Sequence, residues 1–248
     1  MPMKRHHRHL SNGFTLVEMA IVLMIVGLLL GGLIPTLSAQ MESQRINETR
    51  KSMAEIQDAL TGFAIANGRL PCPANPAIAT GQAGAGTERT PPCTGGNSTG
   101  VLPWATLGVN ETDAWGNRFT YRVSSDFADA VGSATYGGCT PSPAPTLSTF
   151  ALCSDGNLDV LSAAPAGANV ATNVPAVIVS HGKNAAGAYT PQGAQLPVGS
   201  NADEQENSDG SADNNYVSHT PTPNFDDLVV WLSNNILLNR MVAAGKLP

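Results

Sequence analysis

The sequence has no ionisable side chain between Met19 and Met41. An uncharged apolar run of this length can cross the roughly 30 Å hydrocarbon core of a bilayer as a helix. Glu18 lies inside the wider apolar stretch that starts at Phe14, where a carboxylate costs on the order of several kcal/mol unless it finds a partner. The segment therefore predicts a membrane helix in which Glu18 has a functional role.

Charge is scarce in the rest of the chain as well. Only 13% of the residues are charged and the net charge is −6, with no basic patch interleaved with aromatic residues. Nucleic-acid binding therefore has little support. The sequence also lacks Gly-x-Ser-x-Gly, His-Glu-x-x-His and phosphate-loop motifs. With 25 Gly and 18 Pro, the part after the apolar run reads as a loop-rich domain rather than a helical bundle.

One titratable centre remains as a candidate for catalysis, His181 between Ser180 and Gly182-Lys183. Neighbours on a strand point to opposite faces, so Ser180 and His181 do not form a natural nucleophile–base pair. A turn at the end of a strand is the simpler interpretation, and His219 is most simply a loop residue. We expect no enzyme here.

Cysteine is limited to four residues, Cys72, Cys93, Cys139 and Cys153, all on the outer side of the predicted span. No Cys-x-x-Cys pair or adjacent histidine exists, which disfavours a zinc site. An oxidising compartment favours two disulfides, for which three connectivities are open. We favour Cys72–Cys93 and Cys139–Cys153, because each closes a loop rich in Gly, Pro, Ser and Thr.

The N-terminal flank gives the apolar segment an orientation. Lys4, Arg5 and Arg8 precede it with no acid, so the N-terminus is expected on the cytoplasmic side. A secretory signal peptide would explain the small residues at 37–39, but the apolar run is too long for one. A plain signal anchor explains the length but not Glu18.

A third interpretation accounts for all these features. Gly13-Phe14-Thr15-Leu16-Val17-Glu18 resembles the cleavage motif of type IV prepilins and type II secretion pseudopilins. The resemblance implies a leader at 1–13, cleavage between Gly13 and Phe14 by a membrane peptidase, methylation of the Phe14 amine, and a functional acid at Glu18. It implies as partners the prepilin peptidase/methylase, other pilin or pseudopilin subunits, an inner-membrane assembly platform and lipid. Which machine, and whether the subunit is major or minor, stays open.

Elementary electrostatics supports the role given to Glu18. Cleavage creates an amine at the head of an apolar helix, and Glu18 lies about one turn away. In a filament, Glu18 of one subunit can pair with the Phe14 amine of its neighbour, since a buried charge without its partner costs about 3–5 kcal/mol. Pro35 removes one helical hydrogen bond and predicts a kink there.

The remaining pattern predicts an α+β fold with a long N-terminal helical spine packed on a small antiparallel sheet. Residues 14–39 form the membrane half of the helix, 40–66 its outer half with an apolar stripe, and 67–248 a pilin-like ectodomain with long disulfide-tied loops. Strands are expected at 118–123 (half-buried), 158–161, 176–179 and 228–232, and a last helix at 234–244 capped by Ser233. Residues 199–224 read as a polar loop.

Two ectodomain stretches extend the resemblance. Asp113-Ala114-Trp115-Gly116-Asn117-Arg118-Phe119 is similar to the Asp-Pro-Trp-Gly-Asn-Pro-Tyr run of major pseudopilins, with Ala114 and Arg118 in place of the prolines. The polar, acidic stretch that begins at residue 199 and continues to Asp227 resembles the loop in which major pseudopilins hold calcium. The implied oxygen ligands are Asp203, Glu204, Glu206, Asp209, Asp213, Asp226 and Asp227.

The sequence thus favours a structural pilin-like subunit in the bacterial inner membrane, with a periplasmic ectodomain. It is later assembled into a type IV pilus or a type II secretion pseudopilus. The alternative is a signal-anchored periplasmic enzyme or ligand-binding protein that uses the ectodomain alone.

Overall fold

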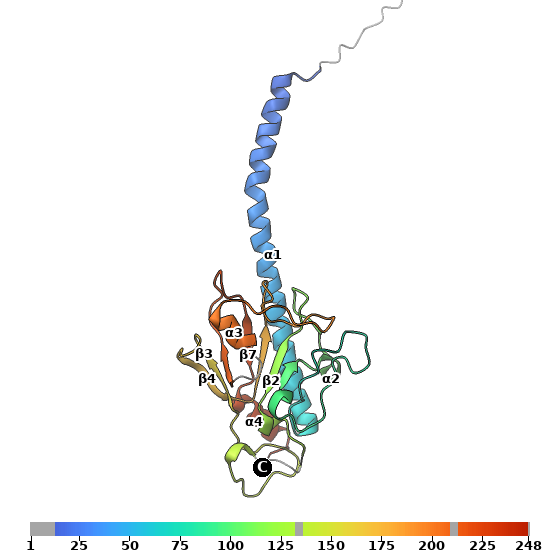
Figure 1. The fold of residues 1–248 in the computed structure, drawn as a ribbon, viewed down its shortest axis with the longest axis vertical. Coiled ribbons are helices and arrows are strands. Elements are labelled where there is room, and N and C mark those ends of the chain that lie inside the picture. Colours follow the sequence, from blue (N-terminus) through green and yellow to red (C-terminus); the bar gives the residue numbers. More distant parts are fainter. Residues whose placement is uncertain (1–12, 132–135, 209–212, 248) are drawn as a thin grey trace, which may run out of the picture. The chain divides into compact units, whose positions relative to one another are not determined.

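A computed structural model describes residues 13–131, 136–208 and 213–247, without the side chains of 30–37. The chain divides into two compact units between Gln44 and Arg45. The helices and strands, labelled in Figure 1, are α1 Leu16–Asn67, β1 Thr99–Val101, α2 Trp104–Leu107, β2 Thr120–Val123, β3 Leu158–Leu161, β4 Asn169–Val174, β5 Ala176–Ser180, α3 Ala202–Ser208, β6 Asn215–Val217, β7 Leu228–Trp231 and α4 Asn234–Ala243.

The first unit contains the beginning of α1. The helix is assigned without interruption over 52 residues, through position 35 as well, so the kink at Pro35 stays a prediction. Between Phe14 and Leu29 the large apolar side chains are exposed, with Leu16 87% and Leu28 75% accessible. Over the described residues, no helix combines the length and the hydropathy that a membrane span requires.

The second unit is built on a four-stranded antiparallel sheet in the order β1-β2-β5-β7. Met53, Ile56 and Leu60 of α1 are buried in one core with Tyr121 of β2 and Ile178 of β5. The residues lie three and four apart on the helix, which places them on a single face. The predicted packing of a helix stripe on an antiparallel sheet is therefore confirmed.

A second sheet, in the order β4-β3-β6, was not predicted. Its β3–β4 pair is antiparallel, whereas β3 and β6 are parallel. Side chains of β3 and β6 form a further core with Val177 and Val179 of β5. In Figure 1 β3 and β4 lie on one side of this unit and α2 on the other.

The prediction that β2 is half-buried is wrong. All four of its residues are buried, including Thr120 and Arg122. The strand is central in its sheet, between β1 and β5. Arg122 tolerates this position because its guanidinium donates to Thr99 Oγ1 at 3.0 Å and to Asn214 Oδ1 at 2.7 Å. The polar side chain of Arg122 therefore makes its hydrogen bonds with protein groups, and the alternating pattern does not indicate a face exposed to water.

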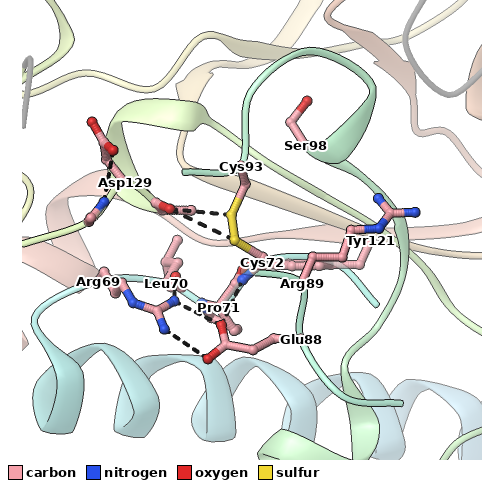
Figure 2. The surroundings of a disulfide bond; sticks show 12 residues. Arg69, Leu70, Pro71, Cys72, Glu88, Arg89, Cys93, Ser98, Tyr121 and Asp129 are labelled. Carbon is pink, nitrogen blue, oxygen red and sulfur yellow. Dashed lines mark hydrogen bonds and ion pairs between the residues drawn. A yellow bond between two sulfur atoms is a disulfide. The ribbon is translucent and has the colours of Figure 1, made fainter. Parts of the chain in front are cut away.

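Both favoured disulfides are present, Cys72–Cys93 and Cys139–Cys153, with Cα–Cα separations of 5.6 and 5.9 Å. Figure 2 shows the surroundings of the first, which is fully buried. Beside it Glu88 receives two hydrogen bonds from the Arg69 guanidinium, both 2.8 Å, and one from Cys72 N at 3.1 Å. The bridge and this ion pair together attach the 72–93 loop to the end of α1.

Candidate functional site

The start of α1 carries the residues that the sequence marks for processing. Gly13 and Phe14 precede the helix, and Phe14 is 79% exposed. Gly13 is exposed, and a Cβ placed on it meets no atom of the described residues within 4 Å. Both residues of the predicted cleavage bond are therefore accessible in this chain.

Glu18 and Thr15 form a capping box at the N-terminus of α1. Glu18 Oε2 accepts hydrogen bonds from Thr15 N and Thr15 Oγ1, both at 2.9 Å, while Glu18 N donates to Thr15 Oγ1 at 3.2 Å. Such reciprocal bonds satisfy backbone donors that a helix terminus otherwise leaves open. Sequence reasoning missed this role, although Thr-x-x-Glu before an apolar run is its usual signal. The pairing of Glu18 with a Phe14 amine stays a prediction.

The loop Asp113–Asn117 is bonded to the sheet through one buried carboxylate and to α1 through one backbone N–H. Asp113 Oδ1 accepts from Trp115 N and Asn117 N, both at 3.0 Å, and Oδ2 accepts from Ser180 Oγ at 2.6 Å. The next backbone N–H, that of Ala114, donates to Thr49 Oγ1 on α1 at 3.2 Å. Gly116 has a φ of 88°, which a turn of this kind requires and other residues rarely adopt.

Arg118, which stands where the resembling family has proline, is fully buried in the same region. Its guanidinium donates to Glu111 Oε1 at 2.8 Å, Pro76 O at 2.9 Å and Pro191 O at 3.0 Å. It also lies 4.6 Å from the centre of the Trp104 ring. Three separate loops therefore converge on one cation, a function that a proline cannot supply.

Three of the predicted calcium ligands come together at the ends of β5 and β7. One oxygen each of Glu204, Asp226 and Asp227 lie within 4.8 Å of one another. Gly182 makes the approach possible, because a Cβ at that position would overlap Asp226. Asp226 Oδ2 accepts from Lys183 N at 2.8 Å and from Asn184 N at 3.0 Å. The Ser-His-Gly-Lys-Asn run is thus the turn that was expected, and it holds a carboxylate in place.

Two buried oxygens of this cluster, Asp226 Oδ1 and Asp227 Oδ1, have no hydrogen bond to a described residue. Asp227 is 2% exposed, and its other oxygen accepts from Asn207 Nδ2 at 2.8 Å. Burial, followed by the charges of Glu204 and Asp226, raises the pKa of Asp227 to about 8. A divalent cation bound by these oxygens would relieve both the missing bonds and the repulsion, so the residues fit calcium.

His181 lies behind the cluster and is completely buried. Its Nε2 is 2.8 Å from Thr120 Oγ1, whereas its Nδ1 is 3.9 Å from Asp227 Oδ1 and has no hydrogen bond. Burial lowers the pKa of His181 to about 4, so the ring is neutral at physiological pH. Ser180 is bonded to Asp113 instead, which agrees with the expectation that Ser180 and His181 do not form a pair.

The other predicted ligands lie outside the cluster. Asp203 accepts from Ala164 N at 2.7 Å and contacts His219 Nε2 at 3.1 Å. Asp213 accepts from Asn215 N at 2.7 Å. Glu206 is half-buried on α3, and Asp209 lies outside the described residues.

Comparison with known proteins gives one match, which covers the N-terminal part of the chain. Residues 8–34 match the family described as the prokaryotic N-terminal methylation motif. No curated protein and no solved structure matches the chain. The match contains Gly13, Phe14 and Glu18.

The burial of Asp113 predicts a pH dependence that one variant isolates. Burial raises the pKa of Asp113 above its ordinary value of 3.8, against the hydrogen bonds from Ser180 and from the backbone. The folded protein therefore keeps this proton at pH values where the unfolded chain has lost it, and the contribution of Asp113 to the unfolding free energy falls as pH rises above about 4. Asp113→Asn removes the titration, so relative to wild type it gains stability between pH 4 and pH 7.

The measurement is chemical denaturation of both proteins across this range. Asp58→Asn, which removes an exposed acid from α1, is the control and should follow the wild-type curve. Wild-type and Asp113→Asn stabilities that stay a constant distance apart over the whole range would show that the carboxyl does not titrate as described.

Proposed function

Because residues 8–34 carry the signature of type IV pilins and pseudopilins, we propose that this chain is a pilin-like subunit that is stored in a membrane and then assembled into a filament. The prepilin peptidase/methylase cuts between Gly13 and Phe14 and methylates the new amine. The mature subunit joins other pilin or pseudopilin subunits through an inner-membrane assembly platform. The filament is a type IV pilus or a type II secretion pseudopilus.

The observation that carries this proposal is the exposed apolar surface at the start of α1. Phe14, Leu16 and Val17 are 79%, 87% and 66% accessible, and the exposure continues to Leu29. Contiguous apolar surface of this kind marks an interaction site, since leaving it in water is unfavourable. Lipid covers it during storage and the helices of neighbouring subunits cover it in the filament.

Glu18 supplies the specificity that apolar packing lacks. An amine at Phe14 placed among apolar helices needs an anion, and a carboxylate placed there needs a cation. Pairing Glu18 of one subunit with the Phe14 amine of the next satisfies both and fixes the axial register. A mispaired subunit leaves a buried charge that costs about 3–5 kcal/mol.

The ectodomain is proposed to face the periplasm, with the N-terminus in the cytoplasm and residues 14–39 in the inner membrane. The basic leader favours this orientation. Two disulfides in the second unit are typical of an oxidising compartment. The competing hypothesis is an uncut, signal-anchored periplasmic enzyme or ligand-binding protein.

Calcium is the cofactor we propose for the ectodomain, held by Glu204, Asp226 and Asp227. Support comes from the two buried oxygens without hydrogen bonds, on Asp226 and Asp227. A cavity of about 540 Å³ bordered by Glu204 and Asn184 gives the ion and its waters an entry path. Backbone carbonyls and water would complete the six to eight oxygens that calcium takes.

Intact mass spectrometry of the protein recovered from its host membrane tests the processing. The expected mature chain begins at Phe14 and carries one additional methyl group. A Gly13→Leu variant should stay uncut, because a bulky residue before the bond obstructs the protease cleft. An uncut wild-type chain, or one that begins at Gln40, would contradict the proposal and favour the anchored alternative.

The pairing is tested with two variants that separate it from helix capping. Glu18→Val removes the carboxylate, and we expect membrane insertion to persist while incorporation into filaments falls at least tenfold. Thr15→Val removes only the capping hydroxyl and should cost about 1 kcal/mol of helix stability with little effect on incorporation. Incorporation is measured by quantifying the subunit in sheared filaments. Equal losses in both variants would assign Glu18 to capping alone.

Calorimetric titration of calcium into the full chain in detergent tests the metal site. We expect saturable binding that Asp227→Asn weakens about tenfold or more, since one ligand charge is removed. Asp213→Asn changes the net charge equally but lies outside the cluster, so its affinity should match wild type. Absence of calcium heat, together with an unchanged melting temperature after chelation, would exclude the site.

A further inference from the structure

A second polar cavity opens where the edge of the four-stranded sheet meets the 187–195 loop, apart from the acidic cluster. Its volume is about 330 Å³, at the lower end of the range of small-molecule pockets. The side chains that line it and bear on its chemistry are those of Arg89, Thr99, Thr120, Tyr189, Gln195 and Ser208. None of the described residues that line it is acidic, so among them Arg89 gives the cavity a positive charge in a protein whose net charge is −6.

Arg89 is half-buried and has no carboxylate partner among the described residues. The adjacent Glu88 is bonded to Arg69 at 2.8 Å, and Figure 2 shows the Arg89 side chain pointing away from that carboxylate. Burial lowers the pKa of Arg89, which reflects the cost of holding a cation there. By contrast, Arg69 and Arg118 each have a glutamate within 2.8 Å.

The hydrogen bonds of Arg89 leave one edge of its guanidinium open. Nη1 donates to Thr99 O at 2.9 Å and, at 3.5 Å, to Gly96 O. No hydrogen bond joins Nε or Nη2 to a described residue. Two parallel N–H groups on one edge match the two oxygens of a carboxylate, which is the geometry of the strong bidentate pair.

The 187–195 segment lines the cavity with neutral polar groups and is held by backbone pairing. Tyr189 pairs with Arg118 and with Gln195 in antiparallel bridges, and Leu196 N donates to Ala188 O at 2.8 Å. The Tyr189 hydroxyl has no hydrogen bond to a described residue. One N–H of the Gln195 side-chain amide donates to Gly187 O at 3.2 Å, and the amide oxygen accepts no hydrogen bond from a described residue. These groups suit the hydroxyls of a ligand, and the tyrosine ring offers an apolar face.

We propose that this cavity binds a small hydroxylated carboxylate, of the class of a sugar acid, with its carboxylate on the Nε–Nη2 edge of Arg89 and its hydroxyls facing Tyr189 and Gln195. The size of the cavity limits the ligand to about one ring. The inference concerns a ligand of the ectodomain and is independent of filament assembly and of calcium.

A ligand-observed NMR titration of the full chain in non-ionic detergent tests the proposal, with D-glucuronate as the probe and glucose and acetate as comparators. We expect glucuronate to saturate and both comparators to bind about tenfold more weakly or not at all. Arg89→Gln should weaken glucuronate about tenfold or more, because it loses the bidentate ion pair. Arg50→Gln removes an exposed arginine from α1 and should bind glucuronate like wild type.

Tyr189→Phe keeps the ring and removes the hydroxyl, and we expect it to weaken glucuronate several-fold without a change in melting temperature. This variant keeps the test valid if Arg89→Gln does not fold. No saturable binding of glucuronate, or equal affinity in wild type and the folded variants, overturns the proposal. Equal affinity for glucose overturns the role of the carboxylate, and equal affinity for acetate overturns the role of the hydroxyls.

Discussion

The apolar contact between the outer half of α1 and the four-stranded sheet is the interaction on which the second unit depends. Met53, Ile56 and Leu60 are fully buried there, and Ala64, also fully buried, continues the same face. Thr49 extends the same face in polar form and accepts a hydrogen bond from Ala114 N. Through that bond the helix holds the Asp113 loop, and through Ser180 the loop holds β5. One face of a single helix thereby orders most of the elements around the candidate sites.

The scarcity of charge makes each buried charged group informative. Arg69 is paired with Glu88, Arg118 with Glu111, and Asp113 receives hydrogen bonds on both oxygens. Burying a charged group without such compensation is costly, so compensated groups are explained by the fold itself. The carboxylates around Asp227 and the open edge of the half-buried Arg89 depart from this pattern. A ligand of opposite charge gains most binding energy where a charged side chain lacks hydrogen bonds or an ion pair within the protein. We therefore propose binding functions at these two places.

Much of the fold followed from local sequence signals. The outer helix stripe, strands β3, β5 and β7, the start of α4 and the disulfide pairing were predicted correctly, because alternation, helical spacing and loop closure are local properties. Ser233 occupies the N-cap position of α4 but makes no side-chain capping bond, so its predicted capping role is not supported. Strands β1, β4 and β6 were missed, because Asn169–Val174 is half polar and mostly exposed, and Thr99–Val101 and Asn215–Val217 are very short. Strands β4 and β6 are stabilised by pairing with β3, and β1 by pairing with β2, which are contacts that no single segment encodes.

The candidate sites were less predictable than the fold for the same reason. A count of acids gave seven oxygen ligands for calcium, yet only turns and tertiary contacts decide that Glu204, Asp226 and Asp227 meet. Helix α3 was not predicted within the acidic stretch. Asn201 is a typical N-cap residue, and its Oδ1 accepts hydrogen bonds from the backbone N–H groups of Asp203 and Glu204. The role proposed for Arg89 could not be predicted, because the sequence does not show which arginine has no carboxylate partner in the fold.

Under the proposed cleavage and assembly, Glu18 serves two partners in succession. In the uncleaved chain Oε2 accepts the two hydrogen bonds that Thr15 donates, and no described residue donates to Oε1. Cleavage puts a positive amine at the N-terminal end of the helix, where the macrodipole already disfavours positive charge. An approaching amine of a neighbouring subunit can use Oε1 while Thr15 keeps Oε2, so pairing does not require the helix start to open. In the proposed pairing, the carboxylate is already oriented by its own helix before it meets the amine, which lowers the entropic cost of assembly.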